Sequence, residues 1–302
     1  MSAKGRAEVV RLFKKDGSSE LQSTQKLQFA VDYLNFFGYI AVALLRSIDI
    51  ADIKSAVKAF QRVFGLKVDG VLGPKTLRAM EGPRCGCPDI IDTENKQHLQ
   101  FIQAQESSAA RRDQWNKKGL TYAVNQYVSG TVSKEAQSNI FASAFKAWDD
   151  VCGLNITEIK DQKAADILIT TGKGPQHQFD GQGGTLAWAY LPTGADQQLT
   201  MRFDLDETWV EHPRDRGVLI HNVACHEFGH SLGLSHSTSN GALMAPYYNP
   251  FIGTPQLDDD IPRIEKLYGK NMEIAAIKAK RKAEKVRTVE IRLGQSLLVT
   301  CK

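Results

Sequence analysis

The segment 226–236 reads HEFGHSLGLSH and constrains the fold and chemistry more than any other part of this 302-residue sequence. His226 and His230 are four residues apart, so on a helix they share one face and can bind one metal ion together. Gly233 lacks a side chain, so the chain can leave that helix through a left-handed turn that brings His236 to the same ion. Three protein ligands leave the fourth position of a tetrahedral zinc ion open, as in catalytic rather than structural sites.

Two neighbouring features strengthen this prediction. Glu227 follows the first histidine, where it can accept a proton from a water molecule on the metal. Met244, within the sequence LMAP of residues 243–246, stands at the distance expected of the methionine-containing turn that underlies the zinc of such sites. Two histidines on a helix arise by chance, and a lone methionine is an ordinary core residue. Together with the third histidine, these residues predict a catalytic zinc site.

A second motif, PRCGCPD over residues 83–89, supplies a thiol. A thiolate is a soft and strong zinc ligand. If Cys85 occupies the open position, no water can bind there and an enzyme would be latent. The alternative is a turn rich in cysteine, proline and glycine that a disulfide closes.

The two motifs, in this order, resemble those of the matrixins, the matrix-metalloproteinase branch of the metzincin zinc endopeptidases, and the resemblance runs from about residue 21 to residue 269. It implies an α+β fold: a metzincin catalytic domain, with a twisted, mostly parallel five-stranded sheet and three helices, after a small three-helix propeptide akin to peptidoglycan-binding modules. It also implies that Arg84 and Asp89 pair to hold the cysteine loop, with Cys85 on zinc in the latent form. Cys87 stands where the family has an aliphatic residue, and it offers a competing thiol.

The motifs and the resemblance divide the chain into five expected segments. These are an N-terminal extension (1–20), a helical propeptide with the cysteine motif (21–90), a linker (91–112), the catalytic domain (113–269) and a basic tail (270–302). Activation would require cleavage in the linker, where Arg111-Arg112 is dibasic but the full four-residue basic processing signal is absent. The tail is too short for the haemopexin-like propeller of many matrixins, so we expect none.

Apolar periodicity predicts elements on both sides of the linker. Apolar residues recur at helical spacing over 57–64, and Gly73-Pro74 marks the start of the next helix. Residues 138–151 have the spacing of an amphipathic helix, and residues 166–170 read as a short apolar strand.

The resemblance further implies a calcium site and a substrate-binding edge. Calcium prefers a mix of carboxylates and carbonyls, here from Asp180, Gly181, Gly183, Thr185, Asp204 and Glu207. The alternative is a turn with solvated acids. A peptide substrate would add to the edge strand by main-chain hydrogen bonds and place a side chain against a pocket wall, with contacts at Leu186, Ala187, Pro246 and Tyr248.

We predict that the second, structural zinc of the family is absent. Its ligands are three histidines and an aspartate, but the matching positions hold Lys173, Pro175, Trp188 and Arg202. None of these is a good zinc ligand, and two are cationic. His177 lies nearby but would be alone, so we expect Trp188 to pack where the metal would sit.

Charge and hydropathy limit the classes of partner. The net charge of +4 is too small to predict nucleic-acid binding, and much of the positive charge lies in 270–302. No apolar stretch reaches transmembrane length, and no secretory signal is visible at the N-terminus. Matrixins are normally secreted, so the resemblance implies an extracellular protein.

The cysteines leave the redox state open. With Cys85 on zinc, three disulfide pairings are possible among Cys87, Cys152, Cys225 and Cys301. A Cys152–Cys225 bridge and a pair of buried thiols both fit the sequence.

These inferences predict a secreted, latent zinc endopeptidase that hydrolyses internal peptide bonds of extracellular matrix or other extracellular proteins. The expected partners are protein substrates, an activating protease and proteinaceous metalloproteinase inhibitors, and we expect a monomer. One alternative is a catalytically weak, matrixin-like binding protein, against which the intact Glu227 argues. The other is a polysaccharide-binding module built on the N-terminal helices, against which the neighbouring cysteine motif argues.

Overall fold

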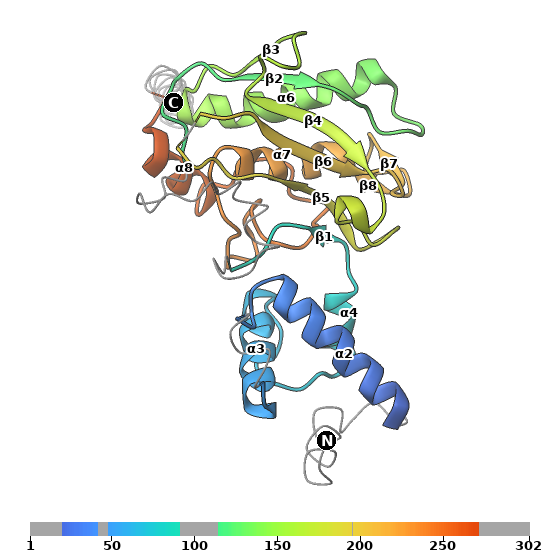
Figure 1. Ribbon diagram of the computed structural model, residues 1–302. Helices are drawn as coiled ribbons and strands as arrows, with labels where there is room; N and C mark the ends of the chain where they lie inside the picture. The colour runs from blue at the N-terminus through green and yellow to red at the C-terminus, as the bar shows by residue number, and fades with distance from the viewer. Residues whose placement is uncertain (1–19, 42–47, 91–113, 195, 272–302) are drawn as a thin grey trace, which may run out of the picture.

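A mixed β-sheet forms the centre of the structure, and the cysteine motif contributes to it. The computed structural model describes residues 20–41, 48–90, 114–194 and 196–271, without the side chains of residues 20–23 (Figure 1). The predicted N-terminal extension, linker and basic tail, with Arg111-Arg112 and Cys301, therefore lie almost entirely outside the described residues.

Six strands form the sheet in the order β1-β5-β6-β4-β2-β3. Neighbouring strands are parallel except for β5 and β6, which are antiparallel. The strands are β1 (Arg84–Cys85), β2 (Thr121–Val124), β3 (Thr157–Glu158), β4 (Ile167–Gly172), β5 (Thr185–Ala189) and β6 (Leu199–Asp204). Five of these strands, β2 to β6, lie in residues 113–269, the predicted catalytic domain, which is called the catalytic segment below. The sixth strand, β1, comes from the cysteine motif and was not predicted.

Helices α6 (Lys134–Cys152) and α7 (Ile220–Ser231) pack together against the sheet. Helix α6 begins four residues before the predicted start because the side chain of Ser133 accepts the N–H of Ala136 and caps the helix. The apolar face predicted for α6 is buried, and the ring of Phe145 stacks on that of Phe228 of α7, with centroids 3.5 Å apart. This contact fixes the helix that carries the first two predicted zinc ligands.

Short elements complete the catalytic segment. They are η2 (Pro175–His177), β7 (Trp209–Val210), β8 (Val218–Leu219) and α8 (Asp260–Tyr268). The hydroxyl of Tyr268 donates to the carbonyl of Leu232 at 2.8 Å and accepts the N–H of Trp115 at 3.0 Å. These bonds tie α8 both to the end of α7 and to the beginning of the catalytic segment. The described part of that segment has three α-helices, α6, α7 and α8, as predicted.

The N-terminal segment has its own hydrophobic core, formed around helices α2 (Glu20–Phe36), α3 (Ile50–Val63) and α4 (Pro74–Met80). Asp49 and Asp52 form a reciprocal capping box at the start of α3. The buried amide of Gln61 accepts the N–H groups of Asp69 and Gly70 and donates to Thr76, which fixes the loop between α3 and α4. The three helices agree with the prediction.

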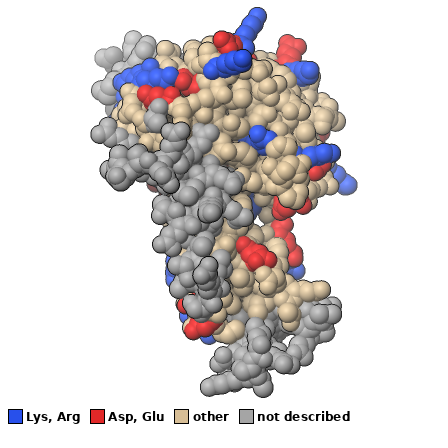
Figure 2. Space-filling model, in the orientation of Figure 1, with Lys and Arg blue, Asp and Glu red and all other residues tan. Residues whose placement is uncertain are grey.

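Figure 1 shows this helical bundle beside the sheet, with β1 reaching from the bundle to the edge of the sheet. On the face drawn in Figure 2, Lys and Arg side chains lie next to Asp and Glu across both parts of the molecule. Within the part of the chain that the structure describes, no helix has the length and apolar character needed to cross a membrane.

Four cysteines in the described part of the chain are free and buried. The Sγ atom of Cys152 lies 3.2 Å from the carbonyl oxygen of Trp148, and that of Cys225 lies 3.8 Å from the carbonyl oxygen of Ala144. Of the two alternatives open for this pair, the structure has the buried thiols and not the bridge.

Candidate active site

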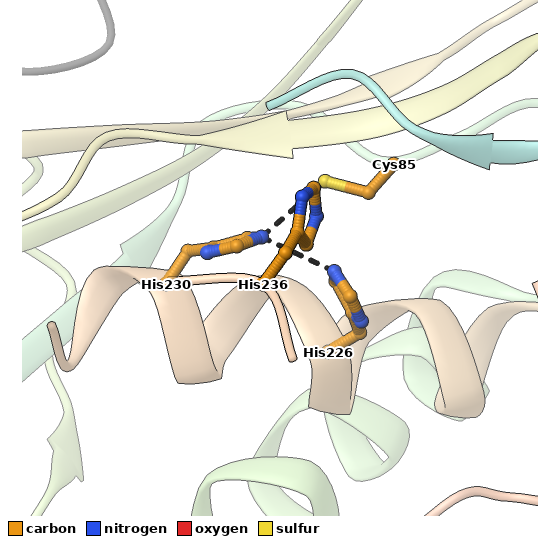
Figure 3. Close-up of side chains that lie close together, drawn as sticks. All are labelled: Cys85, His226, His230 and His236. Atoms are coloured by element: carbon orange, nitrogen blue, oxygen red, sulfur yellow. Dashed lines mark hydrogen bonds between the residues drawn. The ribbon is translucent and has the colours of Figure 1, made fainter. Parts of the chain in front are cut away.

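Helix α7 and the chain that follows it bring three imidazoles to one point (Figure 3). The Nε2 atoms of His226 and His230 are 3.1 Å apart. Gly233, with a φ of 103°, turns the chain after the helix, and His236 returns to the same point. Cys85 completes the group from β1, with its Sγ 3.4 Å from Nε2 of His230. One ligand atom from each of these four side chains lies within 4.8 Å of the others.

Backbone carbonyls orient two of the imidazoles. Nδ1 of His226 lies 2.7 Å from the carbonyl oxygen of Leu243, and Nδ1 of His230 lies 2.7 Å from that of Leu234. Because a carbonyl oxygen only accepts hydrogen bonds, each Nδ1 carries a proton, and Nε2 of the neutral ring keeps its lone pair. Both lone pairs therefore belong to the nitrogens that meet at the centre of the cluster.

The surroundings shift the pKa values of the three rings in different directions. Burial, aided by the nearby His236, lowers the pKa of His226 to about 3 and that of His230 well below its usual value. These two rings are therefore neutral, as metal ligands must be. Burial also lowers the pKa of His236, but the thiol of Cys85 and the carboxylate of Asp89 outweigh burial, so the net shift is upward.

Glu227 is fully buried, and within the described residues neither of its carboxylate oxygens has a hydrogen-bond partner. Burial, followed by the neighbouring thiol of Cys85, raises the pKa of Glu227 well above its usual value. Burying a carboxylate without a hydrogen-bond partner costs free energy. Its presence here indicates that the partner of Glu227 is a group other than the surrounding side chains.

The donor set fits zinc. Imidazole nitrogen and thiolate sulfur are the ligands that zinc prefers, and three protein ligands with a carboxylate alongside are typical of catalytic sites. Nε2 of His236 is buried and has no hydrogen-bond partner in the described part of the chain, which leaves its lone pair available. The orphaned carboxylate of Glu227 lies beside the same point.

Met244 lies directly beneath α7. It is fully buried, and a Cβ added to Gly229 would collide with its sulfur, so the helix and the methionine turn are in close contact. The carboxylate of Asp260 accepts the N–H groups of Leu243 and Met244 at 2.7 and 3.1 Å. The carbonyl of Met244 accepts the N–H of Ser237 at 2.7 Å, which ties the turn to the residue after His236.

The backbone of residues 83–86 lies between strand β5 and segment 246–248. On the β5 side, the N–H of Arg84 donates to the carbonyl of Gly184 at 2.9 Å, and that of Gly86 donates to the carbonyl of Ala187 at 2.8 Å. On the other side, the N–H of Cys85 donates to the carbonyl of Pro246, and the carbonyl of Pro83 accepts the N–H of Tyr248, both at 2.9 Å. The cysteine motif therefore occupies the edge and the wall at which a peptide substrate was predicted to bind.

A buried ion pair holds the cysteine loop. A guanidinium nitrogen of Arg84 lies 2.6 Å from a carboxylate oxygen of Asp89, so the predicted pair is present. The guanidinium lies 3.4 Å over the ring of Phe37 and donates to the hydroxyl of Tyr33, while the hydroxyl of Tyr39 donates to Asp89 at 2.6 Å. Burial raises the pKa of Asp89, but Arg84 and His236 together outweigh burial and hold that pKa at about 2.

Comparison with known families agrees with this geometry. Residues 114–269 match the family model of the matrixins, which covers more than half of the chain. The chain belongs to the matrixin family. Residues 23–80 match the model of a peptidoglycan binding domain, in agreement with the fold of the three-helix segment of this matrixin.

Individual relatives place this matrixin beside proteins from several animals. It is 37% identical to matrix metalloproteinase-18 of Xenopus laevis over 273 residues, which are 87% of this chain and 54% of that protein. It is 38% identical to the hatching enzyme of Paracentrotus lividus over 72% of this chain and 34% of that protein. It is 38% identical to interstitial collagenase of Bos taurus over 72% of this chain and 43% of that protein. The chain thus spans about half or less of the length of these relatives.

Cys87, at which this matrixin departs from the family pattern, lies beside Cys85. The two Sγ atoms are within 4.8 Å of each other, and the N–H of Cys87 donates to Sγ of Cys85 at 3.3 Å. The thiol of Cys87 donates to the carbonyl of Ala189 at 3.2 Å. Both cysteines pack with Phe179 and Trp188, and burial raises the pKa of both thiols.

A pocket opens beside Glu227 and the first histidine. Of the four predicted substrate contacts, Leu186, Pro246 and Tyr248 line it, together with Cys85. Ala187 does not line it, but its carbonyl accepts a backbone hydrogen bond from Gly86. The sequence did not indicate the remaining wall, which includes Asn222, Val223, Leu243, Tyr247, Asn249 and Ile252. The first two lie one turn before His226 on α7, so helical spacing from that histidine was the available signal.

The predicted calcium residues gather in the loop before β5 and at the end of β6. Asp180 accepts the N–H of Thr185 at 2.7 Å, and Glu207 accepts that of Gly183 at 2.5 Å. Asp204 is fully buried, and one of its oxygens has no partner in the described part of the chain. Burial, and to a lesser extent the neighbouring acids, raises the pKa of Asp204 and of Glu207. These acids are not among the described groups of three or more ligands that converge within 4.8 Å.

Trp188 packs beside the other positions at which we predicted the loss of a second zinc site. Its indole N–H donates to the carbonyl of His177 at 2.9 Å, and the guanidinium of Arg202 lies 5.5 Å from the ring centre. Nδ1 of His177 bonds the carbonyl of Lys173 at 3.0 Å. Pro175 begins the η2 turn beside them. Within the described residues, these side chains form no cluster of three metal ligands.

Proposed function

We propose that this matrixin is a secreted, latent zinc endopeptidase that hydrolyses internal peptide bonds of extracellular proteins. The observation that carries the proposal is the meeting of Cys85, from the N-terminal segment, with the three histidines of the catalytic segment. One thiol and three imidazoles form a full tetrahedral set in which the thiol takes the position that substrate chemistry needs.

Zinc would be held by His226, His230 and His236. When bound, it supplies a Lewis acid that polarises the scissile carbonyl and makes a water molecule more acidic. Glu227 accepts a proton from the attacking water and returns it to the leaving amine. Its burial and its lack of other partners among the described residues support this role, because no competing hydrogen bond holds the carboxylate away from the reaction.

Substrate recognition would combine main-chain and apolar contacts. An extended peptide would bond to β5 on one side and to segment 246–248 on the other, as residues 83–86 do in the latent form. The pocket walls of Val223, Leu243 and Ile252 favour an apolar side chain on the C-terminal side of the cleaved bond. Extracellular matrix proteins are one such class of substrate.

Latency would rest on more than the thiol. The backbone of residues 83–86 occupies the substrate edge, and the Arg84–Asp89 pair holds its shape. The ring of Phe64, at the end of α3, lies 5.4 Å from that of Tyr247 in the pocket wall. Removal of the propeptide by an activating protease would free the edge, the wall and the fourth zinc position together.

Calcium would bind at Asp180, Asp204 and Glu207, with carbonyls of Gly181, Gly183 and Thr185. The buried, unpartnered oxygen of Asp204 supports this assignment, as do the raised pKa values of Asp204 and Glu207. A bound cation would offset the repulsion among these neighbouring carboxylates and fix the loop before β5. We propose a single zinc per chain, because the second site of the family has lost its ligands.

The proposed partners follow from this chemistry. They are protein substrates, an activating protease and proteinaceous metalloproteinase inhibitors that fill the same cleft, and the protein would act as a monomer outside the cell. A polysaccharide-binding role for the helical segment is the second candidate, and the match to a peptidoglycan binding domain favours it. Binding of the full-length protein to insoluble peptidoglycan would test that role separately.

The deciding experiment is cleavage of a quenched, apolar-rich peptide by the zinc-loaded full-length protein. It is measured before and after a thiol-reactive mercurial, with a zinc chelator as control. Activity that arises on treatment and disappears with the chelator is the expected result. Bound zinc without activity, even after the propeptide has been removed, would contradict the proposal.

A further inference from the structure

The dithiol Cys85-Gly86-Cys87 is a feature that the proposed protease does not use. One thiol is sufficient to fill the fourth zinc position, yet the structure buries two thiols side by side, with exposed fractions of 6% for Cys85 and 1% for Cys87. Their sulfur atoms lie within 4.8 Å of each other. We propose that Cys85 and Cys87 form a reversible disulfide that withdraws the switch thiol and opens the site without cleavage of the chain.

The local geometry permits this bond. Residues separated by one other residue have Cα atoms no more than roughly 7 Å apart, which is the upper limit for a disulfide. The chain bends at Gly86 and Cys87, and the N–H of Cys87 already points to Sγ of Cys85 at 3.3 Å. Closing the bond therefore needs rotation of the side chains and a local shift of the backbone. That shift would also loosen the hydrogen bonds by which Cys85 and Gly86 cover the substrate edge.

An oxidant has a route to one of the two thiols. Cys85 lines the pocket beside Glu227, whereas Cys87 does not and donates to the carbonyl of Ala189 instead. A small hydroperoxide that enters this pocket would meet Cys85 first. Cys87 does not line the pocket but lies beside the oxidised sulfur, where it can attack that sulfur as a resolving thiol.

The reaction balances with a hydroperoxide as the oxidant. The sulfur of Cys85 attacks the hydroxyl oxygen of the hydroperoxide and the O–O bond breaks. A sulfenic acid forms, and the leaving alkoxide takes the proton of the Cys85 thiol and departs as an alcohol. The sulfur of Cys87 then attacks the sulfur of Cys85, the S–O bond breaks and water leaves. Overall, two thiols lose two hydrogens, one S–S bond forms, and the hydroperoxide is reduced to an alcohol and water.

The consequence rests on the proposed function. A disulfide sulfur carries no negative charge and is a poor zinc ligand compared with a thiolate. Oxidation would therefore free the position that Cys85 holds, and reduction by a dithiol would restore latency. The matched control is Cys87→Val, which keeps an apolar side chain against Phe179 and Trp188 but removes the resolving thiol.

The test has a mass arm and an activity arm. In full-length, zinc-loaded Glu227→Gln protein, an equimolar alkyl hydroperoxide is expected to remove two hydrogens from the peptide that contains residues 83–89. Both cysteines should then resist alkylation until a dithiol is added. Cys87→Val in the same background should gain oxygen on Cys85 instead. In protein with Glu227 intact, peptide hydrolysis should rise by about tenfold on oxidation and fall on reduction, and the Cys87→Val protein should show no reversible rise.

Two outcomes would overturn the inference while the mercurial still activates the enzyme. One is the absence of the two-hydrogen loss, and the other is a disulfide that forms without any gain in activity. A protein that no treatment activates, including removal of the propeptide, would instead contradict the proposed protease. The mass arm would then decide on its own whether the disulfide forms.

Discussion

The carboxylate of Asp89 lies 2.7 Å from Nδ1 of His236, so a residue of the N-terminal segment touches the third imidazole of the cluster. The contact is close but lacks the alignment of a hydrogen bond. The same oxygen of Asp89 lies 2.6 Å from the guanidinium of Arg84. One carboxylate therefore connects the shape of the cysteine loop to the chain that follows α7.

Replacement of Asp89 should abolish latency. Asp89→Ala leaves the guanidinium of Arg84 buried without its partner, which costs about 3–5 kcal/mol when one member of a buried pair is removed. The propeptide should then dissociate readily, and the full-length protein should hydrolyse a quenched peptide without mercurial treatment. The matched control is Glu81→Gln, an exposed acid of the same segment that should stay latent. Latency of the Asp89 variant equal to that of the unaltered protein would refute the role given to the ion pair.

Replacement of Glu227 should separate catalysis from metal binding. Glu227→Gln keeps the shape of the side chain but cannot accept a proton, so peptide hydrolysis after propeptide removal should fall by roughly 10²–10⁴-fold. Zinc content, measured by mass spectrometry of the metal, should not change, because the three histidines remain. Glu135→Gln on the exposed face of α6 serves as the control and should keep full activity.

Calcium should stabilise the protein more at neutral pH than in acid. The folded state raises the pKa of Asp204 and Glu207 above their ordinary values of 3.8 and 4.5. Protonation of such groups favours the folded state, so their contribution is greatest below the unfolded pKa and is lost as pH rises through the folded pKa. A cation offsets the loss, and the gain in Tm on adding calcium should be small near about pH 4 and reach about 5–10 °C near about pH 7.

The measurement uses calorimetry of Glu227→Gln protein that has been freed of calcium on a chelating resin and resupplied with zinc. Asp204→Asn should reduce the calcium-dependent shift at neutral pH, whereas the exposed Asp206→Asn should change it little. A shift of the same size at both pH values would argue against the carboxylates as ligands.

Contact between α7 and the methionine turn should make Gly229 intolerant of any side chain. A Cβ at Gly229 collides with Met244 and approaches the ring of Trp148. Gly229→Ala should therefore lower stability by about 1–3 kcal/mol and Tm by about 2–10 °C. Gly241→Ala offers the same chemical change at a position with open space and should leave Tm within about 1–2 °C of the parent. Equal Tm values for the two variants would show that the packing does not constrain the helix.

Metal analysis should find one zinc per chain. The protein is dialysed against metal-free buffer and its zinc is counted by mass spectrometry. His226→Ala should remove that zinc, and His177→Ala should retain it, because His177 bonds the carbonyl of Lys173 and has no other metal-ligating side chain grouped with it in the described residues. Two zinc ions per chain would contradict the loss of the second site.

Local patterns explain what the sequence predicted. The spacing of His226 and His230 depends only on helical geometry, and the amphipathic face of α6 depends on residues within a few turns of one another. Helix ends were less accurate, since α6 begins at Lys134, where the side chain of Ser133 caps it. Capping by one hydroxyl moves a helix boundary without altering the apolar pattern.

Long-range pairing explains what the sequence could not predict. Strand β1 is only two residues long and has no alternation of its own, so its pairing with β5 depends on contacts made by distant segments. The contact between Asp89 and His236 and the wall at Asn249 and Ile252 depend on the same packing. That Cys85 and Cys87 lie close to each other could be inferred from their spacing in the sequence. Their shared burial against Trp188 could not.

The pairing of β1 with β5 also bears on how the protein reaches its folded state. Every residue of β5 is buried, and β1 covers its outer edge. Without the N-terminal segment, this edge would present unpaired N–H and C=O groups that another chain could join. The propeptide would thus protect a newly made chain from aggregation as well as from premature activity. A catalytic segment refolded alone would then depend on dilution or on a peptide ligand in its cleft to remain in solution.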